Sequence, residues 1–287
     1  MSYRGRIAPS PTGYLHVGHA RTFWIAAQRA QSKHGTLILR NEDLDPDRSR
    51  PEYVHAMFED LHWLGMHWSE GPDIGGPYAP YSQSQRRHLY LEAWRTLVAT
   101  GHVYPCTCSR KDLQQAAQAP HESTQPTDSQ TTDEEPIYPG TCRPNPGAPP
   151  ITPPESPAGL NWRFQVPDGE AIEFTDGHFG PQRLIAGRDF GDFLVWRRDD
   201  VPAYQLAVVV DDHLMRITEV VRGQDLLVST ARQLLLYRAL GWTPPDWYHC
   251  PLVTDSEGRR LAKRHDALSI RTLRQQGQTP AQVLGLE

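Results

Sequence analysis

The run His16-Val17-Gly18-His19 joins a predicted strand to a predicted helix, and this junction constrains the fold more than any other feature of the chain. Residues 4–8 have a strand-like composition, residues 9–13 break the strand, and residues 20–30 carry apolar side chains at helical spacing. A helix start offers free amide donors and a partial positive charge to anions. Both histidines can donate to phosphate oxygens, and Gly18 has no Cβ to hold a nucleotide away. The junction therefore predicts a phosphate site rather than two surface histidines beside a turn.

Strand-like and helix-like segments alternate along the rest of the chain. This alternation predicts an α/β fold with a doubly wound parallel sheet, whose ligands bind at the carboxyl ends of the strands. The phosphate site predicted at His16 lies at such an end. We expect helices over 51–64, 83–100 and 226–240, and strands over 36–40, 160–166, 193–197, 218–221 and 248–253.

The charge balance excludes a protein with a global basic field. The chain has 29 Lys and Arg against 34 Asp and Glu, a formal net charge of −5, so any RNA contact must use local basic patches. No apolar run approaches the length of a membrane span, and the first residues do not resemble a signal peptide. We therefore expect a cytoplasmic protein with reduced thiols and no membrane partner.

A second basic element lies near the end of the chain. The run Arg260-Leu261-Ala262-Lys263-Arg264 follows Asp255-Ser256-Glu257-Gly258, which has the composition of a turn. On such a loop, Lys263 can move over a bound anion. Taken alone, a basic run after a turn is more often an ordinary solvated surface.

Three of the four cysteines have a spacing that favours a metal ion over a disulfide. Cys106 and Cys108 can place two thiolates on one ion, and Cys142 follows a turn that can deliver a third. By chemistry alone, His102 or His121 could supply the fourth ligand. The alternative is three reduced, buried cysteines, and Cys250 is expected to be a core residue.

Residues 111–159 are rich in glutamine, threonine, proline and acidic residues, a composition that cannot bury enough apolar surface to offset its ordering entropy. We expect a floppy insertion here, between the second and third metal ligands. Because the cost of loop closure grows slowly with loop length, the insertion weakens the predicted metal site only modestly.

The two basic elements resemble a known pair of motifs. Arg6-Ile7-Ala8-Pro9-Ser10-Pro11-Thr12-Gly13 followed by His16-Val17-Gly18-His19 resembles the HIGH signature of class I aminoacyl-tRNA synthetases, glutamyl branch, and the run 260–264 resembles their KMSKS loop. Ala262 stands where the family usually has serine, which could alter loop closure without removing the charge of Lys263. The resemblance implies a Rossmann-like core with an inserted zinc-containing subdomain.

The resemblance also implies roles for individual residues. Arg222 suits the side-chain carboxylate of an acidic substrate, although without the resemblance a buried salt bridge for Arg222 and packing for Tyr204 would be preferred. In the glutamyl-Q tRNA(Asp) synthetases, which this chain resembles over nearly its whole length, a tyrosine joins three cysteines on zinc. The implied sites are ATP, with Mg²⁺, at Pro9, His16, Gly18, His19 and Lys263; L-glutamate at Arg6, Ala8, Ser10, Glu42, Tyr204 and Arg222; one structural zinc at Cys106, Cys108, Tyr138 and Cys142; and catalysis by His16, His19 and Lys263.

The implied activity is the formation of glutamyl adenylate and its transfer to queuosine in the anticodon loop of tRNA(Asp). Residues 185–193 resemble this subfamily, and we expect no anticodon-binding domain after the core. The alternatives are a truncated glutamyl-tRNA synthetase that charges tRNA(Glu), a small-molecule nucleotidyltransferase, and a non-catalytic RNA-binding paralogue, which would be expected to lack His16, His19 or Lys263. We expect a monomer with four segments: half of the core (1–101), the metal-binding insertion (102–159), the rest of the core (160–241), and the basic loop with a helical end (242–287).

Overall fold

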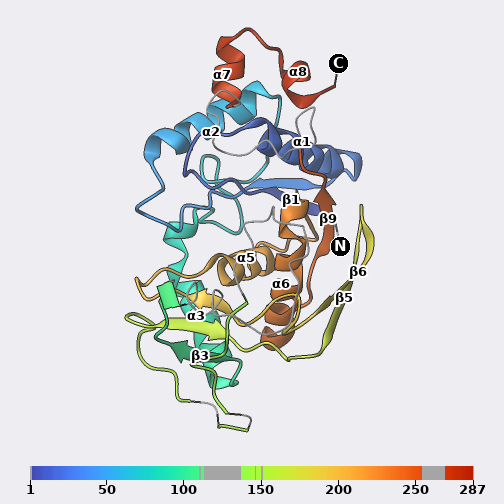
Figure 1. Cartoon of the computed structure of the whole chain (residues 1–287). Helices are drawn as coiled ribbons and strands as arrows, with labels where there is room; N and C mark the ends of the chain where they lie inside the picture. Colours follow the sequence, from blue (N-terminus) through green and yellow to red (C-terminus); the bar gives the residue numbers. More distant parts are fainter. Residues whose placement is uncertain are drawn as a thin grey trace.

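The computed structural model describes residues 2–109, 111–112, 137–145, 147–149, 151–253 and 269–286. Strands β1 and β2 pair in parallel, as do β8 and β9, and the Thr218 N–H donates to the Arg4 carbonyl at 2.9 Å where β8 runs beside β1. The two parallel pairs, β1-β2 and β8-β9, with β8 beside β1, confirm the predicted Rossmann-like α/β core (Figure 1). These strands are β1 (Arg4–Ile7), β2 (Thr36–Leu39), β8 (Glu219–Gly223) and β9 (Asp246–Cys250).

Helices cover both faces of this sheet because neighbouring side chains of each strand point in opposite directions. Ile38 and Val220 pack into a cluster with α3, α5 and α6, whereas Leu39 and Val221 pack into a second cluster with α1, α2, α7 and α8. In Figure 1 the second group lies at the top of the molecule. The helices are α1 (Val17–Ser32), α2 (Pro51–Trp63), α3 (Arg87–Ala99), α5 (Tyr204–Leu214), α6 (Leu227–Leu240), α7 (Ile270–Gln275) and α8 (Pro280–Leu284).

Three of the four predicted helices form as expected, and one is broken. Gly241, with a φ of 69°, ends α6 in the left-handed conformation that favours glycine. The helix predicted over 83–100 is wrong in its first turn, which is the 3-10 turn η1 (Gln83–Gln85). Arg86 leaves helical geometry there, and its guanidinium donates to Asp211 and to the carbonyl oxygens of Tyr78 and Pro80.

Helix α5 has no counterpart among the predicted elements. Its run Val208-Val209-Val210 is β-branched and therefore a weak helix former, and residues 206–212 are all buried. A short buried run of this composition is as typical of a strand as of a helix, so the sequence does not identify the helix.

Antiparallel strands are the largest departure from the predicted fold. The strands predicted over 160–166 and 193–197 form, but in a separate antiparallel sheet, β3-β4-β7. In a second departure, β5 and β6 pair in antiparallel fashion as a hairpin, and β5 pairs in parallel with β9 through Asp176 and Trp247. The strand predicted over 248–253 begins and ends earlier, as β9. The added strands are β3 (Val103–Cys106), β4 (Asn161–Phe164), β5 (Ala171–Asp176), β6 (Gly180–Ile185) and β7 (Phe193–Trp196).

Parts of two predictions lie outside the described residues. They are residues 113–136 of the expected floppy insertion and the basic run 260–264 with Lys263. Within the described ranges, no helix has the length and apolarity needed to cross a membrane.

Candidate active site and metal centre

The two histidines of the first motif lie together at the start of α1. His16 is the N-cap, and its Nδ1 accepts the Gly18 N–H at 3.1 Å. A neutral imidazole that accepts at Nδ1 carries its proton on Nε2, which leaves Nε2 as a donor. The His19 ring stacks on the His16 ring with centroids 3.8 Å apart. A Cβ at Gly18 would lie 3.0 Å from His16 Cε1, so in the structure the glycine makes room for the capping ring.

The described residues on both sides of the segment that carries Lys263 lie near this helix start. After the segment, Ser269 bridges to His16, and the Ile270 N–H donates to the Leu15 carbonyl at 2.8 Å. Before it, the residues that follow β9 face α1 across a pocket of about 290 Å³. Its lining is Arg21, Thr22, Ile25, Cys250, Pro251, Leu252 and Val253.

Four residues predicted to bind the substrate lie together at the carboxyl ends of the strands, and they are here called the carboxyl-edge cluster. They are Arg6, Glu42, Tyr204 and Arg222, from β1, the segment after β2, the start of α5, and β8. Burial raises the pKa of Tyr204, and the charges of Arg222, Glu42 and Arg6 all act on its hydroxyl. The carboxyl-edge cluster therefore brings together residues that are as much as 216 positions apart in the sequence, from Arg6 to Arg222.

The loop after β1 lies beside the carboxyl-edge cluster. Glu42 donates its backbone N–H to the Pro9 carbonyl at 3.0 Å, which ties the two segments together. On either side of buried Pro9, Ala8 is partly exposed and Ser10 is exposed. The predicted contacts of these three residues therefore lie beside Glu42.

Arg40 pairs with the carboxylates beside the carboxyl-edge cluster and is missing from the predicted site. It is fully buried, and it donates to Asp212 Oδ1 at 2.6 Å and to Glu42 Oε1 at 3.0 Å. Arg6 Nε donates to the same Asp212 oxygen at 3.4 Å. Burial raises the pKa of Glu42 despite the opposing charges of Arg40 and Arg6. The available signal was an arginine directly after a buried strand, next to a cluster of carboxylates.

Arg222 is buried, with 4% exposure, and its hydrogen-bond partners are neutral. Its Nη1 donates to Gln233 Oε1 at 2.8 Å, and its Nη2 donates to Thr230 Oγ1 at 2.7 Å and to the Leu226 carbonyl at 3.3 Å. Its Nε donates to His249 Nε2 at 3.1 Å. The alternative of a buried salt bridge is therefore not what the structure has within its described residues.

His249 lies between Arg222 and Asp176 and contacts both. Sequence reasoning missed His249 and Asp176. The His249 ring is fully buried, and its Nδ1 lies 2.6 Å from Asp176 Oδ2. Burial and the neighbouring Arg222 charge lower the pKa of His249 to about 4. At neutral pH the ring therefore donates from Nδ1 and accepts at Nε2.

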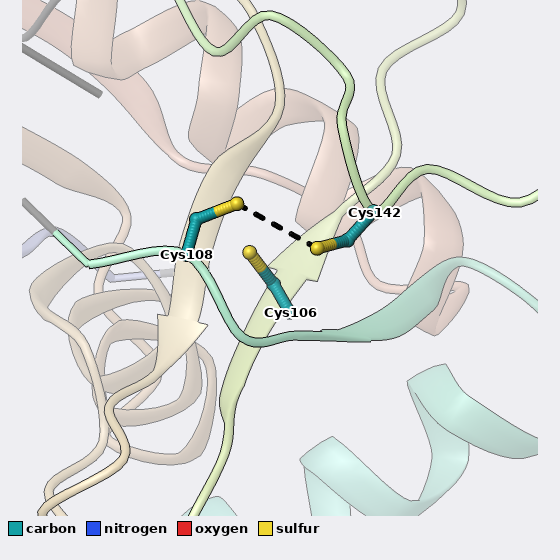
Figure 2. A group of neighbouring side chains, drawn as sticks. All are labelled: Cys106, Cys108 and Cys142. Atoms are coloured by element: carbon teal, nitrogen blue, oxygen red, sulfur yellow. Dashed lines mark hydrogen bonds between the residues drawn. The ribbon is translucent and has the colours of Figure 1, made fainter. Parts of the chain in front are cut away.

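Three cysteine sulfurs converge in the part of the molecule that contains the β3-β4-β7 sheet (Figure 2). Cys106 ends β3, Cys108 follows it, and Cys142 comes from a separate loop. Their sulfurs lie within 4.8 Å of one another, and Cys108 Sγ is 3.6 Å from Cys142 Sγ. A tetrahedral ion with Zn–S bonds of about 2.3 Å holds its sulfurs about 3.8 Å apart. The cluster can therefore hold a metal ion.

Among the candidates for a fourth ligand, the Tyr138 oxygen lies at the cluster. It is 3.4 Å from Cys106 Sγ and 3.5 Å from Cys108 Sγ. His102 instead lies 2.9 Å from the Thr100 hydroxyl through its Nδ1, and His121 lies outside the described residues.

Comparisons with known proteins agree with this geometry. The family model of class I tRNA synthetases (E and Q), catalytic domain, matches residues 2–286. The chain is 49% identical to a glutamyl-Q tRNA(Asp) synthetase of Symbiobacterium thermophilum, over 98% of this chain and 84% of that protein. It is 41% identical to a glutamate–tRNA ligase of Myxococcus xanthus, over 98% of this chain but 56% of that protein.

A solved structure gives the same picture. A glutamate tRNA ligase from Elizabethkingia meningosepticum, determined in complex with its amino acid, superposes with a TM-score of 0.76 at 32% identity, covering 92% of this chain and 52% of that one. Both the sequence and the fold thus match this group of enzymes. The chain belongs to the glutamyl-Q tRNA(Asp) synthetase family, within the class I tRNA synthetases for glutamate and glutamine.

Proposed function

We propose that this protein activates L-glutamate with ATP and transfers the glutamyl group to queuosine at the wobble position of tRNA(Asp). The observation that carries the activation step is the buried guanidinium of Arg222, whose hydrogen-bond partners are neutral. The transfer step is supported by the relatives named glutamyl-Q tRNA(Asp) synthetase, one of which the chain covers over 84% of its length. A glutamate–tRNA ligase is 41% identical to this chain, against 49% for a member of the first group, which favours that group over a tRNA(Glu)-charging enzyme.

The proposed roles of the residues in the carboxyl-edge cluster follow from their charges. Arg222 binds the side-chain carboxylate of glutamate, because a guanidinium matches a carboxylate with two parallel hydrogen bonds. Glu42 accepts from the α-ammonium group, and Tyr204 lies between these two charges. Arg6 adds positive charge near the α-carboxylate, while Ala8 and Ser10 supply contacts from the loop after β1.

The chemistry needs no protein nucleophile. An α-carboxylate oxygen attacks the α-phosphorus of ATP, the bond to the β-phosphate oxygen breaks, and pyrophosphate leaves. A hydroxyl of the queuosine base then attacks the adenylate carbonyl, and AMP leaves. We assign His16, His19 and Lys263 to the phosphate charge, with Pro9 and Gly18 shaping the ATP site, and catalysis comes from alignment and charge stabilisation. A magnesium ion bound with ATP would neutralise further phosphate charge.

For the cysteine cluster we propose one structural zinc ion, with Cys106, Cys108, Cys142 and Tyr138 as ligands. The convergence of three sulfurs from two separate segments supports this assignment, because such a site fixes a loop to a sheet.

Mass analysis of the anticodon nucleosides tests the function directly. The protein is incubated with glutamate, ATP and tRNA(Asp) that carries queuosine, and the digested nucleosides are analysed for glutamyl-queuosine. Matched reactions contain tRNA(Asp) with guanosine at the wobble position, and tRNA(Glu). We expect product with the queuosine-bearing tRNA alone. Charging of tRNA(Glu) at its 3′ end would favour a glutamyl-tRNA synthetase, and adenylate formation without RNA acylation would favour a small-molecule nucleotidyltransferase.

A further inference from the structure

Three other buried arginines, Arg6, Arg40 and Arg86, have carboxylate partners. Arg40 pairs with Asp212 at 2.6 Å, and Arg86 pairs with Asp211 at 2.6 Å. Arg6 also reaches Asp212, at 3.4 Å. These pairs follow the general rule that a charge removed from water is kept only with an opposite charge nearby.

Arg222 departs from this rule. Gln233, Thr230, His249 and the Leu226 carbonyl take up its donors, and Tyr204 contributes a further neutral hydrogen-bonding side chain. The guanidinium also lies 4.7 Å from the centroid of the Trp247 ring. Burial, together with the charge of Arg6, lowers the pKa of Arg222, although the charge of Asp212 acts in the opposite direction without a hydrogen bond to the guanidinium among the described contacts.

We infer that Gln233, Thr230 and His249 form a neutral cage around Arg222, and that the neutrality of this cage lets the enzyme select glutamate over glutamine. The inference rests on the proposed function and deepens it, because it assigns specificity to residues around the arginine. A carboxylate in the cage would satisfy Arg222 before the substrate arrives. Neutral acceptors hold the guanidinium in place and leave its charge for the ligand.

Gln233 is the clearest member of this cage. It is fully buried, its Oε1 accepts from Arg222, and its Nε2 donates to Gln205 Oε1 at 3.0 Å. The amide is therefore oriented by Gln205, so that its oxygen faces the guanidinium. Glutamate at this position would have nearly the same shape and would differ mainly by its negative charge.

His249 is a positioning residue in the same cage. Asp176 Oδ2 lies 2.6 Å from His249 Nδ1, and the Asp176 carboxylate also accepts the His249 backbone N–H at 3.1 Å. With Nδ1 donating, Nε2 is fixed as an acceptor for Arg222. The negative charge of Asp176 thus orients the cage without touching the guanidinium.

The test compares two substitutions at one position, Gln233→Glu and Gln233→Met. In ATP–pyrophosphate exchange, Gln233→Glu is expected to raise the KM for glutamate about tenfold or more, because a fixed carboxylate now pairs with Arg222. It should also reduce the preference for glutamate over glutamine, and leave the KM for ATP unchanged. Gln233→Met removes both side-chain hydrogen bonds of Gln233 but adds no charge, so it should retain that preference.

Gln205→Glu is the matched control, because it adds the same charge to the partner of Gln233, one hydrogen bond further from Arg222. It should retain the preference for glutamate. Far-UV circular dichroism and thermal unfolding show whether each variant folds. Should Gln233→Glu fail to fold, Thr230→Asp places a carboxylate against the other terminal nitrogen, with the same expected result.

The outcomes separate the two levels of the argument. If the wild-type protein shows no glutamate-dependent exchange, the proposed function is wrong. If the wild type is active and the folded Gln233→Glu variant keeps its KM for glutamate and its preference, the cage does not select the substrate. Equal losses of preference in Gln233→Glu and Gln233→Met would show that Gln233 acts through packing rather than neutrality, which also contradicts the inference.

Discussion

Two buried arginines invite comparison: Arg222 in the carboxyl-edge cluster, with 4% exposure, and Arg163 beside the cysteine cluster, with 2%. Neither has a carboxylate among the hydrogen-bond partners described for it. Arg163 Nε donates to Cys106 Sγ at 3.4 Å, and its guanidinium lies 4.1 Å from the Tyr138 ring centroid. The partners of Arg222 are neutral oxygen and nitrogen atoms. One cation thus faces a group that becomes a thiolate when it binds a metal, and the other does not.

The difference distinguishes a charge that stabilises the fold from a charge held for a ligand. A cation beside thiolates is compensated from within the protein, so its removal should cost stability. A cation without an anion costs stability itself, so its removal should cost binding and leave the fold intact or more stable. The two arginines should therefore respond oppositely to the same substitution.

The largest expected effect is that of Arg222→Met on glutamate activation. Losing the buried partner of a carboxylate should lower kcat/KM for glutamate about a hundredfold or more in ATP–pyrophosphate exchange. The free energy of unfolding in urea should stay the same or rise. A loss of activity below about threefold, or a strongly destabilised protein, would contradict the ligand role of Arg222.

Next in size is the effect of Cys142→Ser on stability. Removing one sulfur from the cluster should lower the free energy of unfolding by about 3 kcal/mol and reduce the bound zinc measured by mass spectrometry. Cys250→Ala is the control, because Cys250 is buried at the end of β9 and outside the cysteine cluster. Equal zinc content in Cys142→Ser and wild type would exclude Cys142 as a ligand.

Arg163→Met sharpens the comparison most. It should lower the free energy of unfolding by about 1–2 kcal/mol, because the sulfur cluster loses the cation that donates to Cys106 Sγ. The KM for glutamate should not change. If Arg163→Met and Arg222→Met shifted the urea midpoint in the same direction and by the same amount, the two sites would not differ in the way argued.

The smallest effect concerns the pH dependence of stability. The pKa of His249 is lowered to about 4 by burial, so the unfolded chain takes up this proton first as the pH falls. The free energy of unfolding should therefore drop by about 1 kcal/mol between pH 7 and 5.5 through this residue. His249→Gln should flatten the curve over that range, whereas His55→Gln, at an exposed side chain, should follow the wild type.

Part of the parallel core could be predicted from the sequence because a short apolar run followed by a break, such as residues 36–40, is typical of a buried strand. The start of α1 was equally clear, since His16 and Gly18 stand at a strand-to-helix turn. The β-branched run of α5 is as typical of a strand as of a helix, and the pairing direction of β4 and β7 depends on distant partners rather than on local composition.

The site divides along the same line. The role of Glu42 was implied by the family resemblance, and the sequence itself predicted only its place after a buried strand. Gln233 and His249 were missed because an uncharged amide on a helix and a histidine inside a strand look like ordinary core residues. Their partners, Arg222 and Asp176, are brought to them only by the fold.

The most direct measurement is ATP–pyrophosphate exchange by the wild-type protein with glutamate and glutamine side by side, since the two ligands have nearly the same shape and differ in charge. If Arg222 awaits a carboxylate, glutamate should support exchange with a kcat/KM about a hundredfold or more above that of glutamine. Comparable exchange with both amino acids, or a preference for glutamine, would contradict that role.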